Sequence, residues 1–267
     1  MKAWFDELLI EGPNYGYYPK PSKCILVVKP PMLAHAKLIF KGTKVQVHTE
    51  GSKDTGVEVT SEGTRHLGAA VGTTDFKHNY IKQKIEKWIT AVKKLSEIAT
   101  TQPHAAYATF THCLQSQWTF LSRTMTDCSD LFEPLEQAIR EHLIHALFKR
   151  SVNDTERDML SLPARMGGMG ICKPTEECLL SNKNSIYISA PLVRLIEKQE
   201  YDLDPRELAA EMKRLRSDID KEQEERYKAK REESASRAQT SSERSKRKRC
   251  LKLDHSPPLL RTRHNPT

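Results

Sequence analysis

Apolar residues are scarce in this chain of 267 residues, and no long hydrophobic run occurs in it. Apolar side chains make up 37% and charged ones 29%, against the ~45–50% and ~25% usual for globular domains. Part of the chain therefore has too little apolar surface to build a core. No segment approaches the ~18–20 consecutive apolar residues that a membrane span needs, so we expect no membrane partner. The first residues form a charged amphipathic stretch instead of a secretory signal, which favours a nuclear or cytoplasmic location and not secretion.

Recognisable metal, nucleotide and nucleophile motifs are also lacking. The six cysteines, at positions 24, 113, 128, 172, 178 and 250, are scattered and match neither a disulfide framework nor a zinc-site spacing. The glycine-rich segment 165–170 lacks the Gly-Lys-Ser/Thr ending of a phosphate loop, so it is predicted to be a packing turn. No Gly-x-Ser-x-Gly sequence and no catalytic pair of acids is visible. We therefore expect no cofactor and no small-molecule substrate.

Most of the excess positive charge lies at the end of the chain. Residues 206–267 hold 18 Lys+Arg against 11 Asp+Glu, whereas residues 1–205 hold 25 against 24. The tail 236–267 is predicted to be disordered and basic because it offers little apolar surface to bury. Its densest cluster has two interpretations, a solvated charge run and a nuclear-localisation-like or nucleic-acid-contacting segment. The cluster consists of Lys246, Arg247, Lys248 and Arg249.

Residues 1–74 predict a small β region. The expected elements are a helix (1–10), a strand (24–28), a short helix (32–40), a hairpin of two similar segments (43–51 and 55–63) and a third strand (65–72). The first strand is a continuous apolar run, which indicates that both of its faces are covered. The two similar segments alternate valine with polar residues, the pattern of half-buried strands.

From residue 75 the apolar spacing becomes helical. Stripes that include Ile81, Trp88 and Trp118 predict amphipathic helices, and Asp130 with Glu133 resembles a capping box at the start of another. Asn153 with Asp154 predicts the start of a further short helix. We expect a compact helical bundle over 75–200, followed by a charged helix over 201–235 that is solvated beyond about residue 222. The predicted fold class is therefore α+β.

Four segments, taken in order, resemble the C-terminal part of a retroelement reverse transcriptase. Residues 16–24 resemble polymerase motif D, G-x-x-x-N-x-x-K-T, with Lys23 on the motif lysine, Lys20 in place of its Asn and Cys24 in place of its Thr. Residues 65–72 resemble motif E, whose core is a His-Leu-Gly turn at the primer grip. Residues 101–107 and 162–171 are similar to segments of the thumb, the latter to Leu-Pro-x-x-x-Gly-Gly-Leu-Gly-Ile.

The resemblance implies a palm-like β region (1–74) followed by a thumb-like helical bundle (75–200). It also implies contacts to a primer–template duplex, weak and salt-sensitive. The residues implied in these contacts are Lys20, Lys23, Arg65, His66, Lys84 and Lys87. The activity of the family is RNA-directed DNA polymerisation, for which paired aspartates hold Mg²⁺.

Those aspartates precede motif D in the family, and no residue here matches them. The chain is therefore expected to be inactive alone, as a truncated remnant of a mobile element, and to use Mg²⁺ only if a palm is supplied. A helical protein-interaction module without nucleic-acid function is the alternative, and an enzyme completed in trans is a third. The sequence predicts no oligomeric state.

Overall fold

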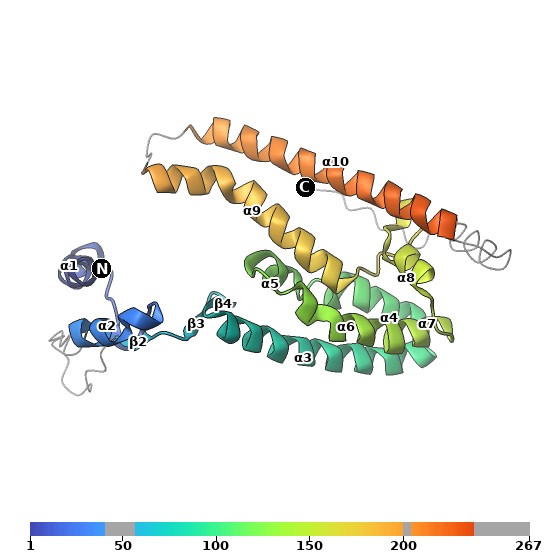
Figure 1. Cartoon of the computed structure of the whole chain (residues 1–267), viewed down its shortest axis with the longest axis horizontal. Helices are drawn as coiled ribbons and strands as arrows, with labels where there is room; N and C mark the ends of the chain where they lie inside the picture. Colours follow the sequence, from blue (N-terminus) through green and yellow to red (C-terminus); the bar gives the residue numbers. More distant parts are fainter. Residues whose placement is uncertain (41–56, 200–203, 238–267) are drawn as a thin grey trace. The chain divides into compact units, whose positions relative to one another are not determined.

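The computed structural model of the protein describes residues 1–40, 57–199 and 204–237 (Figure 1). Two compact units are present, the first from Met1 to Tyr80 and the second beginning at Ile81. A small β region comes first and helices follow it, which confirms the α+β class. Among the described residues, no helix is both long and apolar enough to cross a membrane.

The first unit combines short strands with short helices. Phe5 and Phe40 are buried, and their ring centroids lie 6.3 Å apart, which joins the first two helices. The predicted helices 1–10 and 32–40 are thus confirmed. The elements of this unit are α1 (Lys2–Glu11), η1 (Gly12–Tyr15), η2 (Pro21–Lys23), β1 (Ile25–Val27), η3 (Pro30–Met32), α2 (Leu33–Phe40), β2 (Glu58–Thr60), β3 (Gly63–His66) and β4 (Ala69–Gly72).

Strand pairing differs from the prediction. β2, within the second of the two similar segments, pairs in parallel with β1, with Leu26 opposite Val59. The predicted hairpin partner, 43–51, lies outside the described residues. The prediction that β1 is covered on both faces is wrong, since Ile25 is 44% exposed.

The predicted third strand, 65–72, is instead part of a hairpin and contains the end of β3, a two-residue turn and all of β4. β3 and β4 form an antiparallel hairpin in which His66 pairs with Ala69. The two residues between them, Leu67 and Gly68, have φ angles of 47° and 89°. Two successive positive φ angles give a tight turn whose twist matches that of the flanking strands.

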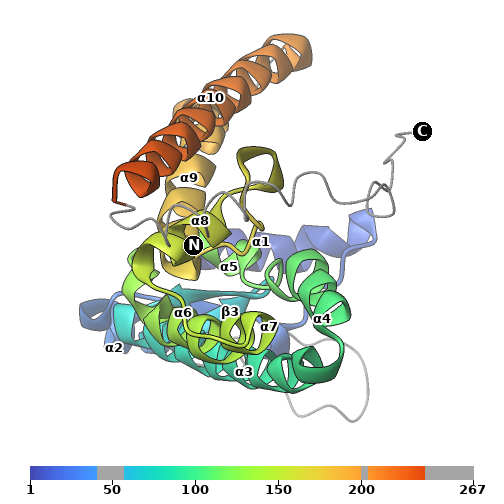
Figure 2. The ribbon, with the colours of Figure 1, turned by 90° about the vertical axis from the view of Figure 1, so that its right-hand side faces the viewer.

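The second unit is helical. In Figures 1 and 2, α3 lies alongside α6 and α7, and α9 and α10 form a long antiparallel pair. Two π-helical stretches, η4 and η6, continue the helices that precede them. The elements are α3 (Thr74–Thr101), α4 (Pro103–Thr109), η4 (Phe110–Leu114), α5 (Thr119–Thr124), η5 (Ser129–Phe132), α6 (Glu133–Ala138), η6 (Ile139–Ile144), α7 (His145–Phe148), α8 (Asp154–Ser161), η7 (Ala164–Met166), α9 (Pro174–Lys198) and α10 (Pro205–Arg237).

An aromatic cluster forms the centre of this helical core. Trp88 of α3 meets Trp118 edge-on at 5.8 Å between ring centroids and stacks on Phe132 at 6.1 Å. Phe110 lies 6.2 Å from Trp118 on the other side. Trp118 is 1% exposed and Ile81 is fully buried, as the helical stripes predicted. Offset and edge-on aromatic pairs add to the free energy gained by burial alone.

The helix starts are only partly as predicted. Asp130 does not cap a helix, because it lies inside the 3₁₀ turn η5, and α6 begins after Phe132 without a side-chain cap. The predicted capping box there is wrong. The predicted start at Asn153 is confirmed, since its side chain accepts a hydrogen bond from the Glu156 backbone N–H at 2.8 Å.

The last described helix is better packed than predicted. α10 continues to Arg237 and contacts α8 and α9, whereas the sequence indicated a solvated helix beyond about residue 222. Leu215 and Ser234 are buried in α10. Apart from its first two residues, which end α10, the predicted disordered tail 236–267 lies outside the described residues.

We predict that Trp118→Ala lowers the free energy of unfolding by ~3–5 kcal/mol, because it empties the centre of the aromatic cluster. Phe120→Ala, two residues away at a side chain that is 47% exposed, is the control and should change stability by about 1 kcal/mol or less. Urea unfolding of the full chain, followed by circular dichroism, measures both. Equal effects of the two changes would contradict the position of Trp118 at the centre of the core.

Candidate nucleic-acid interface

The tip of hairpin β3–β4 is one of the exposed regions that the reverse-transcriptase resemblance implicates. Arg65 and His66 are exposed, and Leu67 is 85% exposed. The turn is held by a hydrogen bond of 2.7 Å in which the Tyr80 hydroxyl donates to the Gly68 carbonyl. Two cationic or titratable side chains and one apolar side chain are therefore presented by an ordered backbone.

Lys20 and Lys23 lie at the two ends of the 3₁₀ turn η2 and are both exposed. The Lys23 N–H donates to the Lys20 carbonyl at 2.9 Å, which closes the turn. η2 contacts β2, and β1 contacts β3. The structure thus places these lysines and the Arg65–His66 pair in the same unit, on elements that β1 and β2 connect.

Lys84 and Lys87 belong to the part of α3 that lies in the second unit. Lys87 is exposed, whereas Lys84 is half-buried at the edge of the face that buries Ile81, Ile85 and Trp88. The tail residues Lys246, Arg247, Lys248 and Arg249 lie outside the described residues.

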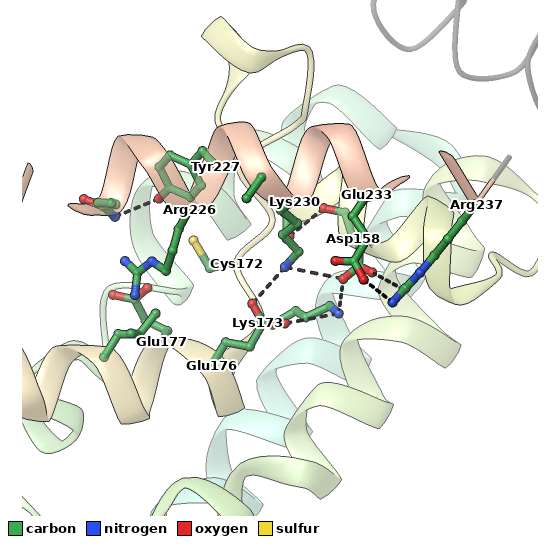
Figure 3. A pocket seen from close by; sticks show the side chains of 14 residues that line it. Asp158, Cys172, Lys173, Glu176, Glu177, Arg226, Tyr227, Lys230, Glu233 and Arg237 are labelled. Atoms are coloured by element: carbon green, nitrogen blue, oxygen red, sulfur yellow. Dashed lines mark hydrogen bonds and ion pairs between the residues drawn. The ribbon is translucent and has the colours of Figure 1, made fainter. Parts of the chain in front are cut away.

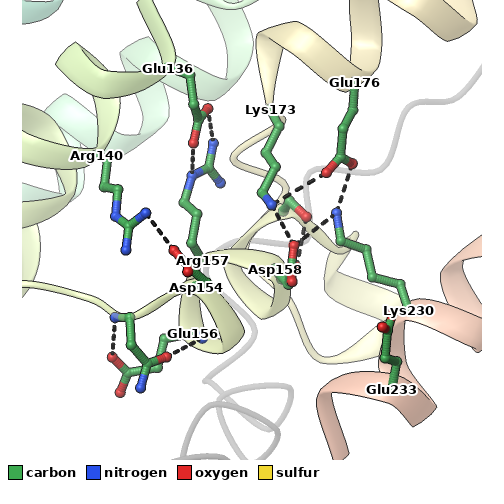
Figure 4. A network of polar contacts seen from close by, with 12 residues as sticks. Glu136, Arg140, Asp154, Glu156, Arg157, Asp158, Lys173, Glu176, Lys230 and Glu233 are labelled. Atoms are coloured by element: carbon green, nitrogen blue, oxygen red, sulfur yellow. Dashed lines mark hydrogen bonds and ion pairs between the residues drawn. The ribbon is translucent and has the colours of Figure 1, made fainter. Parts of the chain in front are cut away.

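A buried ion pair in the second unit was not predicted. Arg157 of α8 is 1% exposed and donates to both carboxylate oxygens of Glu136 on α6, at 2.6 and 2.7 Å (Figure 4). Its remaining donors reach the carbonyls of Ile171 and Cys172 at 2.7 and 3.0 Å. One feature of the sequence could have indicated this ion pair: Glu136 follows the buried Phe132 by four residues and so occupies the same helical stripe.

The glycine-rich segment is a packing turn, as predicted. A Cβ atom at Gly168 would lie 2.0 Å from the Leu162 carbonyl oxygen, so no larger residue fits. The Ile171 N–H donates to the Leu160 carbonyl at 3.0 Å, and the Tyr107 hydroxyl donates to the Met169 carbonyl at 2.6 Å. The backbone groups of this turn are thus used within the fold.

A charged hollow of about 510 Å³ lies where α8, α9 and α10 meet (Figure 3). Lys173 pairs with Asp158 at 2.5 Å and with Glu176 at 3.3 Å. Lys230 of α10 pairs with Glu176 at 2.8 Å and with Asp158 at 3.4 Å. Figure 4 shows these four side chains converging from the three helices and the segment before α9.

The charges of the hollow compensate one another. Burial alone would raise the pKa of Asp158, but hydrogen bonds and the charges of Lys173 and Lys230 outweigh it and hold that pKa below its usual value. Burial and the charge of Glu177 raise the pKa of the Cys172 thiol to about 11, so the nucleophilic thiolate is scarce at neutral pH. The cluster therefore fits a role in attaching α10 better than a role in catalysis.

No metal-binding group is present among residues 1–40, 57–199 and 204–237, in the sense of three or more His, Cys, Asp or Glu side chains gathered together. The side chains implicated in nucleic-acid contacts are instead cationic. Their ordinary chemistry is attraction to phosphate, which needs neither a metal nor a nucleophile.

We predict that Arg157→Met destabilises the protein by ~3–5 kcal/mol, because the Glu136 carboxylate stays buried without its cation. The double variant Arg157→Met/Glu136→Leu should recover part of this loss, since both charges are then removed. Chemical unfolding of the two variants measures the difference. Lys183→Ala, which breaks an exposed ion pair to Glu222, is the control and should cost about 1 kcal/mol or less. A double variant no more stable than Arg157→Met would contradict the penalty assigned to the lone carboxylate.

We predict that Asp158→Asn lowers stability by about 1.5–3 kcal/mol at neutral pH, because Lys173 and Lys230 lose their shared anion. The folded-state pKa of Asp158 lies below its ordinary value of 3.8, so its contribution is present above that pH. The contribution is lost as the pH falls through the folded-state pKa. Unfolding curves of wild type and variant should therefore converge at acid pH, whereas Asp220→Asn, on an exposed part of α10, should follow the wild type throughout.

Comparison with known proteins gives no match: no protein-family model, no curated protein and no solved structure is similar to this chain. The resemblance to reverse transcriptases therefore rests on the residues of the four segments themselves. The chemistry of the exposed side chains has to support any functional hypothesis.

Proposed function

We propose that this chain binds primer–template-like nucleic acid through hairpin β3–β4 and the η2 turn. The observation that carries this proposal is the fixed, exposed tip of the hairpin, with Arg65 and His66 beside the 85% exposed Leu67. Lys20 and Lys23 add exposed cations on another element of the same unit. Cations that neutralise phosphates release condensed counterions, so the binding is expected to weaken as salt rises.

The fixed geometry of the hairpin matters more than its total charge. A flexible basic tail attracts any polyanion alike, because it has no shape with which to distinguish substrates. An ordered turn presents its cations at fixed positions, and the exposed Leu67 can contact a sugar or an unpaired base beside them. Such a surface can distinguish a recessed end from a continuous duplex.

The proposed activity is binding without polymerisation by this chain alone. Nucleotide transfer in this family depends on paired aspartates that hold Mg²⁺, and no residue here matches them. We also propose that the chain originates as a truncated remnant of a mobile-element reverse transcriptase. We further propose that the basic cluster 246–249 acts as a nuclear-localisation-like segment.

A helical protein-interaction module is the second candidate, and one observation favours it. α9 exposes apolar side chains at intervals of seven residues, which places them on one face of the helix. Leu179, Ile186 and Val193 are 64%, 56% and 46% exposed. Exposed apolar stripes of this kind occur at helix-docking surfaces.

We predict that Lys23→Ala/Arg65→Ala weakens binding to duplexes with recessed primer ends more than binding to blunt duplexes. Each phosphate that the variant no longer neutralises should also reduce the salt slope of log K by about 0.9 on B-DNA. Fluorescence anisotropy over a salt series measures both quantities. Lys29→Ala/Lys37→Ala, with the same charge change at exposed lysines of the first unit, is the control and should lower both affinities equally.

Deletion of residues 244–249, which include the basic cluster of the tail, tests whether the preference for recessed ends belongs to the hairpin. If the hairpin recognises primer ends, the deletion weakens all duplexes alike and leaves the preference for recessed ends intact. An equal loss of affinity for both duplexes in Lys23→Ala/Arg65→Ala, or no loss, would contradict the primer-grip hypothesis. The exposed stripe of α9 would then be the better guide to function.

A further inference from the structure

A second surface of the first unit has the opposite chemistry to the hairpin. An open, largely apolar hollow of about 380 Å³ lies at the C-terminal end of α1. Three aromatic side chains line it, and each stays exposed to an unusual degree: Trp4 by 65%, Tyr15 by 85% and Tyr17 by 56%. The remaining lining residues are Glu7, Leu8, Glu11 and Gly12.

The local fold holds this hollow open. Trp4, Leu8 and Glu11 are spaced three to four residues apart in α1, so they share one face of the helix. Phe5 points to the core instead, where it meets Phe40. The floor of the hollow is thus made by residues that the core of the unit does not use.

The tyrosines are placed by a reversal of the chain after α1. The Tyr17 N–H donates to the Gly12 carbonyl at 2.9 Å, and Gly16, with φ of 73°, donates its N–H to the Pro13 carbonyl at 3.0 Å. A Cβ atom at Gly12 would lie 2.8 Å from the Tyr17 carbonyl oxygen, so glycine permits this close return. The Asn14 side chain donates to Glu11 at 2.9 Å and tethers the reversal to the helix.

The charge of the lining has one sign. Glu7 and Glu11 are exposed carboxylates, and the lining contains no lysine, arginine or histidine. The faces of aromatic rings carry negative partial charge, so three rings and two carboxylates all favour a cation. The same arrangement repels phosphate, which separates this surface from the proposed nucleic-acid interface.

We propose that this hollow binds the arginine side chain of a basic peptide. A guanidinium is planar and weakly hydrated, so it stacks on indole and phenol rings while its N–H groups donate to carboxylates. A lysine ammonium is more strongly hydrated and has no flat face to stack. A purely apolar side chain would bring no positive charge to Glu7 and Glu11. The occupant that uses both kinds of lining group is arginine.

Trp4 provides the readout for a direct test with the full chain. The other tryptophans, Trp88 and Trp118, are 6% and 1% exposed, so a ligand in the hollow should change the emission of Trp4 alone. The probes are short synthetic peptides that are identical except at one position, which is arginine, citrulline or lysine. We expect the arginine peptide to shift the emission and to bind about tenfold more tightly than the citrulline peptide, a difference of about 1.4 kcal/mol.

Two outcomes of this titration would overturn the proposal. Equal binding of the citrulline peptide would mean that the hollow takes a neutral flat group. Equal binding of the lysine peptide would mean that any positive charge suffices. A third arm uses a single-stranded oligonucleotide, and saturable quenching of Trp4 by that probe would assign the aromatic surface to nucleic acid instead.

Variants separate the hollow from the rest of the unit. Glu7→Gln/Glu11→Gln keeps the shape and removes the charge, and should weaken the arginine peptide about tenfold with little effect on the citrulline peptide. Glu58→Gln/Glu62→Gln carries the same charge change at exposed positions outside the lining and should bind as the wild type does. Calorimetry with Trp4→Ala, whose exposed side chain is outside the core, should show the same loss. Unchanged affinity in both hollow variants would refute the site.

Discussion

The helical unit depends on one buried ion pair. Arg157 leaves water almost completely, at a cost of several kcal/mol that only close partners can offset. The two oxygens of Glu136 and the carbonyls of Ile171 and Cys172 supply those partners. Arg157 lies in α8, and its partners lie in α6 and at the end of the glycine-rich turn. A single side chain therefore holds these three segments together. The direction in which the chain enters α9 at Pro174 follows from that attachment.

The attachment of α10 is of a different physical kind. Several ion pairs join it to the rest of the unit. Those of Lys230 are partly buried in the charged hollow, whereas Arg165 with Glu224 and Lys183 with Glu222 are exposed. Exposed ion pairs contribute about 0–1 kcal/mol each and are screened by salt. The aromatic cluster around Trp88, by contrast, excludes water. Opening of α10 should therefore require less free energy than opening of the core, which makes it the first described element of this unit to separate.

The sequence predicted those parts of the fold that depend on local periodicity. The stripe of α3 and the start of α8 at Asn153 need only neighbouring residues, and both are confirmed. The parallel pairing of β1 with β2 joins residues more than thirty positions apart, so the local repeat suggested a nearer partner. α10 was underestimated because its stability comes from charged residues of α8 and α9, which no hydrophobic stripe reveals. Glu136 in an apolar stripe was the one local sign of the buried pair.

The candidate sites also divide into residues that the sequence could indicate and residues that only the folded chain brings together. Lys23, Arg65 and His66 could be named from motif order, whereas the hollow at α1 depends on a chain reversal that brings Tyr15 and Tyr17 back beside Trp4. The two surfaces share one loop, since Tyr17 lines the hollow and Lys20, three residues later, immediately precedes η2. Three residues span at most about 11 Å, so a ligand that fixes Tyr17 also restricts the backbone carrying the lysines. Any effect of a bound arginine peptide on the affinity for a nucleic-acid end is then matched by an equal effect in the other direction.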